Sequence, residues 1–187
     1  MMKFATIALV SVLALTACQK QQPQLGPDGQ PIPVAYKITP REEAQIPARL
    51  AGQINQLRAN VGATPVTENP MLDAAAKAHA RDMSAQNRAW HFGSDGSSPL
   101  DRVRRQGYTA HLVGENISET YENEITTLNA WMQNRDTRDV IMDPSVSDFG
   151  IGWYQEPSGK IWWVLLTGSN SMAAPAAPGG FAMASTQ

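Results

Sequence analysis

The sequence predicts an α+β domain, a three-layer α-β-α sandwich around a small, mostly antiparallel sheet. Several segments in the first two thirds of the chain repeat apolar residues at helical spacing. Later, a segment that alternates with glycine and the apolar segment 161–166 are separated by a turn sequence, as in a hairpin. Because segment 161–166 is apolar at every position, it needs cover on both faces, and helices on either side of the sheet provide it.

The first helix is predicted to begin after Thr39. Thr39-Pro40-Arg41-Glu42 combines the capping-box pattern with proline at the first helical position. We expect Pro47 to bend or split this helix and Gly62 to end it. Its apolar face consists of Ile46, Leu50, Ile54 and Leu57.

Two further helices have clear start signals. Asn69-Pro70 begins the second helix, and Ser98-Pro99-Leu100-Asp101 begins a short third helix that Gly107 closes. The apolar face of the second helix consists of Leu72, Ala76, Ala80 and Met83.

The remaining segments supply the sheet and one more helix. Residues 110–118 are predicted to be extended, and residues 124–133 return to helical spacing. Residues 149–153 alternate apolar side chains with glycine, and Glu156-Pro157-Ser158-Gly159 predicts a turn that joins them to the strand at 161–166.

The start of the chain has the pattern of an export signal. Lys3 precedes an apolar run too short to span a bilayer as a mature helix, and Leu15-Thr16-Ala17-Cys18 resembles a bacterial lipobox. We expect residues 1–17 to be removed as a signal peptide and Cys18 to become a lipidated membrane anchor; an unmodified thiol is the alternative. Gln19 is not the aspartate that retains many such lipoproteins in the inner membrane, so the outer membrane is favoured if the organism has two.

Composition divides the rest of the chain into three parts. Residues 18–38 are rich in Gln, Pro and Gly and predict a flexible linker. Residues 39–168 have the size of one domain, and residues 169–187 have the composition of a disordered tail.

With a single cysteine, no disulfide can form within the chain. The formal net charge of −2 gives no sign of a nucleic-acid partner.

The domain also contains a series of short motifs in a fixed order. They are Ile54-Asn55-Gln56-Leu57-Arg58, Ala80-Arg81-Asp82-Met83, the loop from His91 to Gly96, Asp101-Arg102, Gly107-Tyr108, Gly114-Glu115-Asn116-Ile117, Ala130-Trp131-Met132 and Trp162-Trp163-Val164. Their order and spacing resemble the CAP superfamily, named for cysteine-rich secretory proteins, antigen 5 and plant pathogenesis-related proteins, in its compact bacterial form.

The resemblance implies the same sandwich fold and a central cleft built from two histidines and two acids, which bind a divalent metal in some members. Carried over by position, His91 is the first histidine and Glu115 the first acid. Thr137 stands where bacterial relatives have the second histidine, and Asp148 stands where a glutamate is usual. The resemblance therefore assigns a degenerate cleft to His91, Glu115, Thr137 and Asp148.

The chemistry of Glu115 is compatible with that assignment. In an extended segment, Glu115 shares a face with Val113 and Ile117. An acid on an apolar face needs a partner or a raised pKa, and His91 is the candidate partner.

Asp148 leaves two interpretations open. It shares a face with Gly150 and Gly152, a strip without side chains that leaves room either for a ligand or for a closely packed helix. Outside this set, His79 is expected to be structural, His111 exposed, and Trp90 a wall of the cleft.

A metal site needs three or four well-placed ligands. His91, Glu115 and Asp148 are weak candidates that could hold a divalent cation through added waters, whereas Thr137 offers only a neutral hydroxyl. The sequence therefore predicts little bound zinc.

Two functions from different classes remain. The favoured one is a non-enzymatic, membrane-tethered envelope protein whose cleft binds an amphiphile, a cell-wall component or a protein partner. The alternative is a peptidase-like hydrolase, in which His91 acts as general base and Glu115 orients it, with or without a bound ion. Neither a Gly-x-Ser-x-Gly nor a His-Glu-x-x-His motif is present to support the hydrolase.

Overall fold

The computed structural model describes residues 35–170 and the backbone of residues 183–186. The expected signal peptide, the lipidation site Cys18 and the linker as far as residue 34 lie outside the described residues. Among the described residues, no helix combines the length and the hydrophobicity that crossing a bilayer requires. The helices and strands are, in chain order, α1 (Pro40–Ala59), β1 (Thr67–Glu68), α2 (Pro70–Gln86), α3 (Pro99–Arg105), β2 (His111–Thr120), α4 (Glu124–Gln133), α5 (Arg135–Met142), β3 (Asp148–Gln155), β4 (Ile161–Ser169) and β5 (Met183–Thr186).

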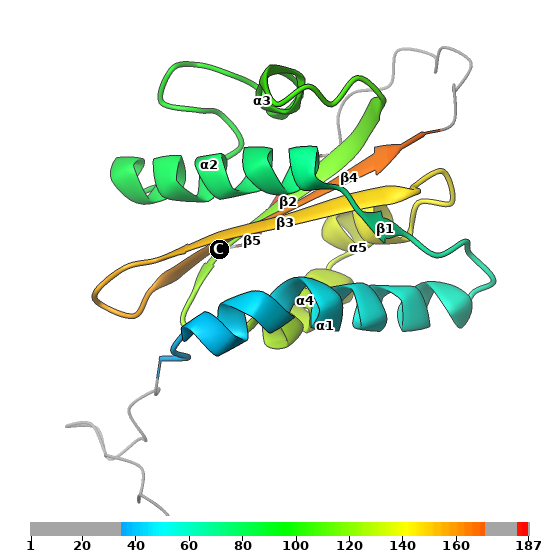
Figure 1. Cartoon of the computed structure of the whole chain (residues 1–187), viewed down its shortest axis with the longest axis horizontal. Helices are drawn as coiled ribbons and strands as arrows, with labels where there is room; N and C mark the ends of the chain where they lie inside the picture. Colours follow the sequence, from blue (N-terminus) through cyan, green and yellow to red (C-terminus); the bar gives the residue numbers. More distant parts are fainter. Residues whose placement is uncertain (1–34, 171–182, 187) are drawn as a thin grey trace, which may run out of the picture. The chain divides into compact units, whose positions relative to one another are not determined.

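The sheet is the middle of three layers (Figure 1). Its strand order is β1-β3-β4-β2-β5. Strands β3, β4 and β2 pair antiparallel, while β1 and β5 pair in parallel at the two edges. Helices α2 and α3 cover one face of the sheet, and α1, α4 and α5 cover the other. The predicted α+β sandwich with its mostly antiparallel sheet is confirmed.

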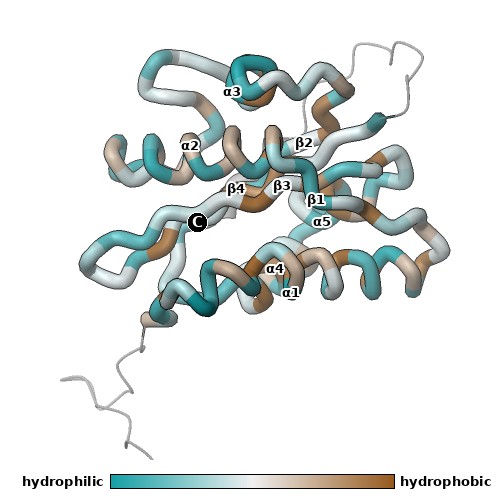
Figure 2. Tube along the Cα trace, viewed as in Figure 1, coloured by the Kyte–Doolittle hydropathy of each residue, from teal (hydrophilic) through white to brown (hydrophobic). Residues whose placement is uncertain are grey.

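An apolar core lies on each face of β4, and Figure 2 shows the hydrophobic stretches of the strands between the helical layers. Trp163 and Leu165 belong to the core that includes the apolar face of α1. Val164 and Leu166 belong to the core that includes the apolar face of α2. Residues 161–166 are all buried, as their continuous apolar pattern predicts.

The glycine strip of β3 is packed against α2. A Cβ atom at Gly152 would lie 2.1 Å from the backbone nitrogen of Lys77, and one at Gly150 would lie 2.3 Å from the Cβ atom of Leu72. Both distances are far below van der Waals contact, so only glycine lets the helix approach this closely. Of the two interpretations of the strip, close helix packing is therefore the correct one.

A buried arginine ties the opposite helical layer together. Arg58 is fully buried at the end of α1 and donates hydrogen bonds to backbone carbonyl oxygens. Its acceptors are the carbonyls of Thr64 (2.7 Å), Ile141 (2.8 Å), Asp143 (3.0 Å) and Val146 (3.1 Å). The end of α1, the end of α5 and the approach to β3 are thus held by one side chain. It also takes the position on the buried face that was expected for Leu57, which is only partly buried.

Further details differ from the sequence-based expectations. Pro47 neither splits nor ends α1, which is assigned as one helix over its whole length. Helix α5 was not predicted, because its eight residues carry few apolar side chains. The tail expected to be disordered contains the last residue of β4 and the strand β5, whereas residues 171–182 and 187 lie outside the described residues.

The close approach of α2 to β3 predicts that Gly152→Ala destabilises the protein by about 2 to 3 kcal/mol, because the added methyl group must push the helix backbone away. The matched control is Gly52→Ala in α1, where an added Cβ meets nothing within 4 Å. That change should be neutral or slightly stabilising, since alanine favours helix. Urea unfolding of both variants makes the comparison, and equal stability of the two would contradict the packing argument.

Candidate functional site

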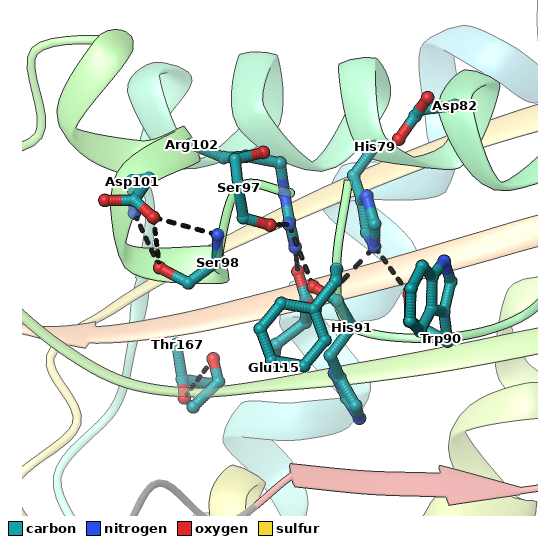
Figure 3. A network of polar contacts seen from close by, with 12 residues as sticks. His79, Asp82, Trp90, His91, Ser97, Ser98, Asp101, Arg102, Glu115 and Thr167 are labelled. Atoms are coloured by element: carbon teal, nitrogen blue, oxygen red, sulfur yellow. Dashed lines mark hydrogen bonds and ion pairs between the residues drawn. The ribbon is translucent and has the colours of Figure 1, made fainter. Parts of the chain in front are cut away.

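The candidate site is centred on the buried carboxylate of Glu115 (Figure 3). Glu115 lies on β2 opposite Leu166, so its side chain points to the face covered by α2 and α3. It is 2% exposed. His91 Nδ1 donates to Glu115 Oε1 at 2.9 Å, and Arg102 Nη2 donates to Glu115 Oε2 at 2.6 Å. The expected contact between His91 and Glu115 is present, and both carboxylate oxygens have a partner.

Arg102 is the residue that sequence reasoning left without a role. It lies on α3 and, besides Glu115, binds the loop that carries the histidine. Its Nη1 atom donates to the carbonyl oxygens of His91 (2.9 Å) and Ser97 (3.0 Å). A signal was available: an acid expected on an apolar face calls for a cation, and an arginine stands beside the capped start of a short helix.

The electrostatics of the site favour an ionised Glu115. Burial alone raises the pKa of this carboxyl group. The hydrogen bond from His91 and the positive charge of Arg102 outweigh burial, so the pKa lies below its usual value. Glu115 therefore stabilises the fold at neutral pH, and this contribution is lost as the pH falls through its folded-state pKa.

His79 has the structural environment expected of it, and it lies closer to Glu115 than its alanine neighbours in α2 suggest. It is fully buried, and its Nε2 atom lies 2.9 Å from the carbonyl oxygen of Trp90, to which it donates. The same atom lies 3.9 Å from Glu115 Oε1. Burial lowers the pKa of His79, so its neutral form is favoured. His111, in contrast, is exposed, as expected.

Thr137 does not join His91 and Glu115. Asn116, the next residue on β2, points to the opposite face of the sheet and donates from Nδ2 to the carbonyl oxygen of Thr137 at 2.9 Å. The Thr137 hydroxyl donates to the carbonyl oxygen of Trp131, a member of the core on that opposite face. The sheet therefore separates Thr137 from the other two residues.

Asp148 is hydrogen-bonded to residues outside the His91–Glu115 pair. Its Oδ2 atom accepts from the Tyr108 hydroxyl at 2.9 Å, and its Oδ1 atom accepts from Asn170 Nδ2 at 2.8 Å. The tyrosine reaches across β4 because Gly168 has no side chain; a Cβ there would lie 2.0 Å from the Tyr108 oxygen. Burial, and then the bond to Asp148, raise the pKa of Tyr108, so this bond persists at neutral pH.

The expected face of Val113 is wrong. The pairing of β2 with β4 shifts between Leu112 and Gly114, which marks a bulge. An extra residue reverses the alternation, so Val113 packs against the core on the α1 side while Glu115 and Ile117 point toward α2. The face shared by Glu115 and Ile117 is as expected.

Trp90 lies beside the His91 loop, at one side of the site. Its indole nitrogen donates to Gln86 Oε1 at 2.9 Å, and the Arg88 guanidinium lies 3.9 Å from the ring centroid. The Phe92 ring lies 5.7 Å away and is 39% exposed. One face of the indole is therefore already covered by a cation, which leaves a small aromatic surface beside the His91 loop.

A resident metal does not fit these residues. Glu115 has both oxygens in hydrogen bonds, and the guanidinium of Arg102 would repel an added cation. Asp148 and Thr137 are held away from His91 by their own partners. Within residues 35–170, no group of three or more His, Cys, Asp or Glu side chains is placed to hold a metal ion.

A cavity of about 250 Å³ lies on the other side of Arg102, between α2, α3 and the loop that follows His91. None of the four residues assigned by resemblance lines it. Two acids and two arginines line it beside small apolar side chains, and their formal charges cancel: Asp82, Asp95, Arg102 and Arg105.

The buried ion pair leads to a prediction about Arg102→Met. This change leaves Glu115 buried without its cation and should destabilise the protein by about 3 to 5 kcal/mol at pH 7. Burial then raises the Glu115 pKa above its unfolded value, so the variant should lose stability as the pH rises from 5 to 8. Urea unfolding across that range measures the effect.

Adding Glu115→Gln to Arg102→Met should remove this pH dependence and recover part of the stability, since no buried charge remains. Arg105→Met, which breaks an exposed pair with Asp95, is the control and should stay near wild type. A pH-independent loss in the Arg102 single variant would show that its role is packing alone.

Comparison with known proteins agrees with this architecture. The model of the CAP family, described as the cysteine-rich secretory protein family, matches residues 52–166. The uncharacterized protein YkwD of Bacillus subtilis is 29% identical over 108 residues, which are 58% of this chain and 41% of YkwD.

Two solved structures share the fold. An extracellular protein containing an SCP domain from Bacillus anthracis has a TM-score of 0.61 at 20% identity, over 72% of this chain and 45% of that protein. An outer surface protein of Borrelia burgdorferi has a TM-score of 0.57 at 17% identity, over 73% of this chain and all of that protein. The chain spans less than half the length of YkwD and of the Bacillus anthracis protein. Because the family model covers more than half of its residues, this chain belongs to the cysteine-rich secretory protein (CAP) family.

Proposed function

We propose that this chain is an extracytoplasmic CAP-domain lipoprotein, held to the cell envelope by a lipid on Cys18, whose domain binds a partner and does not catalyse a reaction. The location is supported by the similar structures, which are an extracellular protein and an outer surface protein. The lipobox-like Leu15-Thr16-Ala17-Cys18 and the linker at 18–38 support the tether.

The observation that carries the binding role is that neither ring nitrogen of His91 is available to a substrate. A hydrolase of this design needs a histidine nitrogen that reaches a substrate or a water molecule. Because Nδ1 donates to Glu115, the base would be Nε2, and this atom is buried without a hydrogen-bond partner among the described residues. Arg102 holds Glu115 from the other side, so the pair serves to fix the His91 loop on β2.

The cavity between α2 and α3 bears on the class of small ligand. Four charged side chains line it beside Ala75 and Ala78, so a ligand that fits there must offer hydrogen-bonding groups to the charges. The size of the cavity lies near the lower end of ligand pockets, about 300 Å³, so it suits one small polar group such as a sugar unit of a wall component. The three ligand classes expected from the sequence, an amphiphile, a wall component and a protein partner, stay predictions.

One observation favours the hydrolase as a second candidate. The bond between Glu115 and His91 Nδ1 is the orientation by which an acid positions a histidine base. Such a site would need the loop at 91–96 to move and expose Nε2.

The binding role predicts no peptide or ester turnover that depends on His91. The full mature protein and its His91→Ala variant should show the same background rate with a mixture of peptide and ester substrates. The wild-type protein should also contain far less than one zinc per chain by elemental analysis, since the site offers no set of three ligands. Turnover that disappears in the variant would favour the hydrolase.

The tether predicts that Cys18→Ala abolishes membrane attachment. Wild-type protein expressed in bacteria should incorporate radiolabelled palmitate and partition into the detergent phase, because acyl chains contribute about 0.8 kcal/mol per buried CH₂. The variant should carry no label and stay in the aqueous phase, while Gln21→Ala in the linker should behave as wild type. Labelled and membrane-bound Cys18→Ala protein would contradict the proposed anchor.

A further inference from the structure

The outer edge of β2 is covered by a short segment from the end of the chain. Strand β5 pairs in parallel with β2, from Glu115 opposite Met183 to Ser118 opposite Thr186. On its other side, β2 pairs with β4 along nearly its whole length. Without β5, β2 would be an edge strand with unpaired backbone N–H and C=O groups, a template for another strand.

This cover is partial. Strand β5 has four residues and β2 has ten. Parallel pairing is also slightly weaker per residue than antiparallel pairing. Residues 171–182 join β5 to the domain, so the pairing is intramolecular and benefits from a high effective concentration. A separate chain that pairs along more of β2 would form more backbone hydrogen bonds and could displace β5.

The edge lies beside the candidate site. Glu115 takes part in the β5 pairing through its backbone, while its side chain binds His91 and Arg102. Helix α5 also contacts β5, so the segment lies along β2 with a helix next to it. A strand bound here is fixed by backbone hydrogen bonds to β2 and is placed next to the ion pair that holds the His91 loop.

We propose that this edge is a binding site for an extended peptide segment of a protein partner, which adds to the sheet as a parallel strand, and that β5 is the resident occupant it displaces. The proposal rests on the binding role above and names the partner class. Strand addition obtains affinity from main-chain hydrogen bonds. Two copies that pair their β2 edges about a two-fold axis do so antiparallel, whereas the edge holds a parallel strand. A second copy would bind in parallel only by exchanging β5, and full-length dimers that the deletion of residues 183–187 abolishes would overturn the proposed partner in favour of that occupant.

The experiment compares the mature Cys18→Ala protein with the same protein lacking residues 183–187. The probe is a fluorescein-labelled peptide with the sequence of residues 181–187, measured by fluorescence anisotropy. The shortened protein should bind it at least tenfold more tightly than the full-length protein, in which β5 competes. Equal affinity for the two proteins, or no binding to either, would overturn the proposal.

Two control peptides test whether binding uses the backbone. Alternate residues of a strand direct their N–H groups to the same side, so proline in place of Ala184 or of Ser185 removes an inward N–H in only one case. One proline peptide should therefore lose much more affinity than the other. Equal binding of both would overturn strand addition, and so would a shortened protein that forms dimers and ignores the peptide.

If the deletion prevents folding, the full-length Ala184→Pro and Ser185→Pro proteins provide the test. In one of them, hydrogen exchange should become faster at the alternate N–H groups of residues 115–118 that point to β5, while the N–H groups of β2 that pair with β4, and those of β3, stay protected. Unchanged exchange in both would overturn the pairing. These outcomes are independent of palmitate labelling and of turnover, so a failure here leaves the anchor and the non-catalytic role standing.

Discussion

The site depends on one buried ion pair, between Arg102 of α3 and Glu115 of β2. A carboxylate at the centre of a sheet face is costly unless its charge is compensated. Arg102 compensates it and uses its other terminal nitrogen to hold two carbonyl groups of the loop from His91 to Ser97. The position of α3, the conformation of the loop and the ionised state of Glu115 are thus consequences of a single contact.

Much of the fold follows from local patterns. The caps at Asn69 and Ser98 place α2 and α3 where the sequence predicts them, and the limits of α4 agree with its apolar stripe. Short or irregular features escaped prediction. Helix α5 has few apolar residues, and one of them, Val140, packs where Gly114 has no side chain. The bulge before Gly114 could not be seen either, because it depends on the pairing with β4.

Two of the four residues assigned to the site, His91 and Glu115, lie together as the sequence predicts. His91 and Glu115 meet as expected, since a histidine loop and an acid on an apolar face have few other ways to satisfy both groups. Thr137 and Asp148 were assigned to the cleft only by their positions in the family resemblance, and a position in the sequence does not determine which residues a side chain contacts. Threonine forms its hydrogen bonds within its own layer, and Asp148 is held by Tyr108 through a gap that Gly168 provides.

The hydrogen bonds of Glu115 and His91 leave the side chains of this site with few groups for a ligand. A cleft that works through side chains needs accessible donors and acceptors, yet both Glu115 oxygens already accept hydrogen bonds and Nε2 of His91 is buried. The backbone of β2 is different, since a strand edge keeps its hydrogen-bonding groups whatever the side chains become. The proposed recognition through the edge therefore does not depend on which side chain stands at position 137. The hydrogen bonds at Glu115 and the strand paired at the edge of β2 are thus the two observations on which the proposed binding role rests.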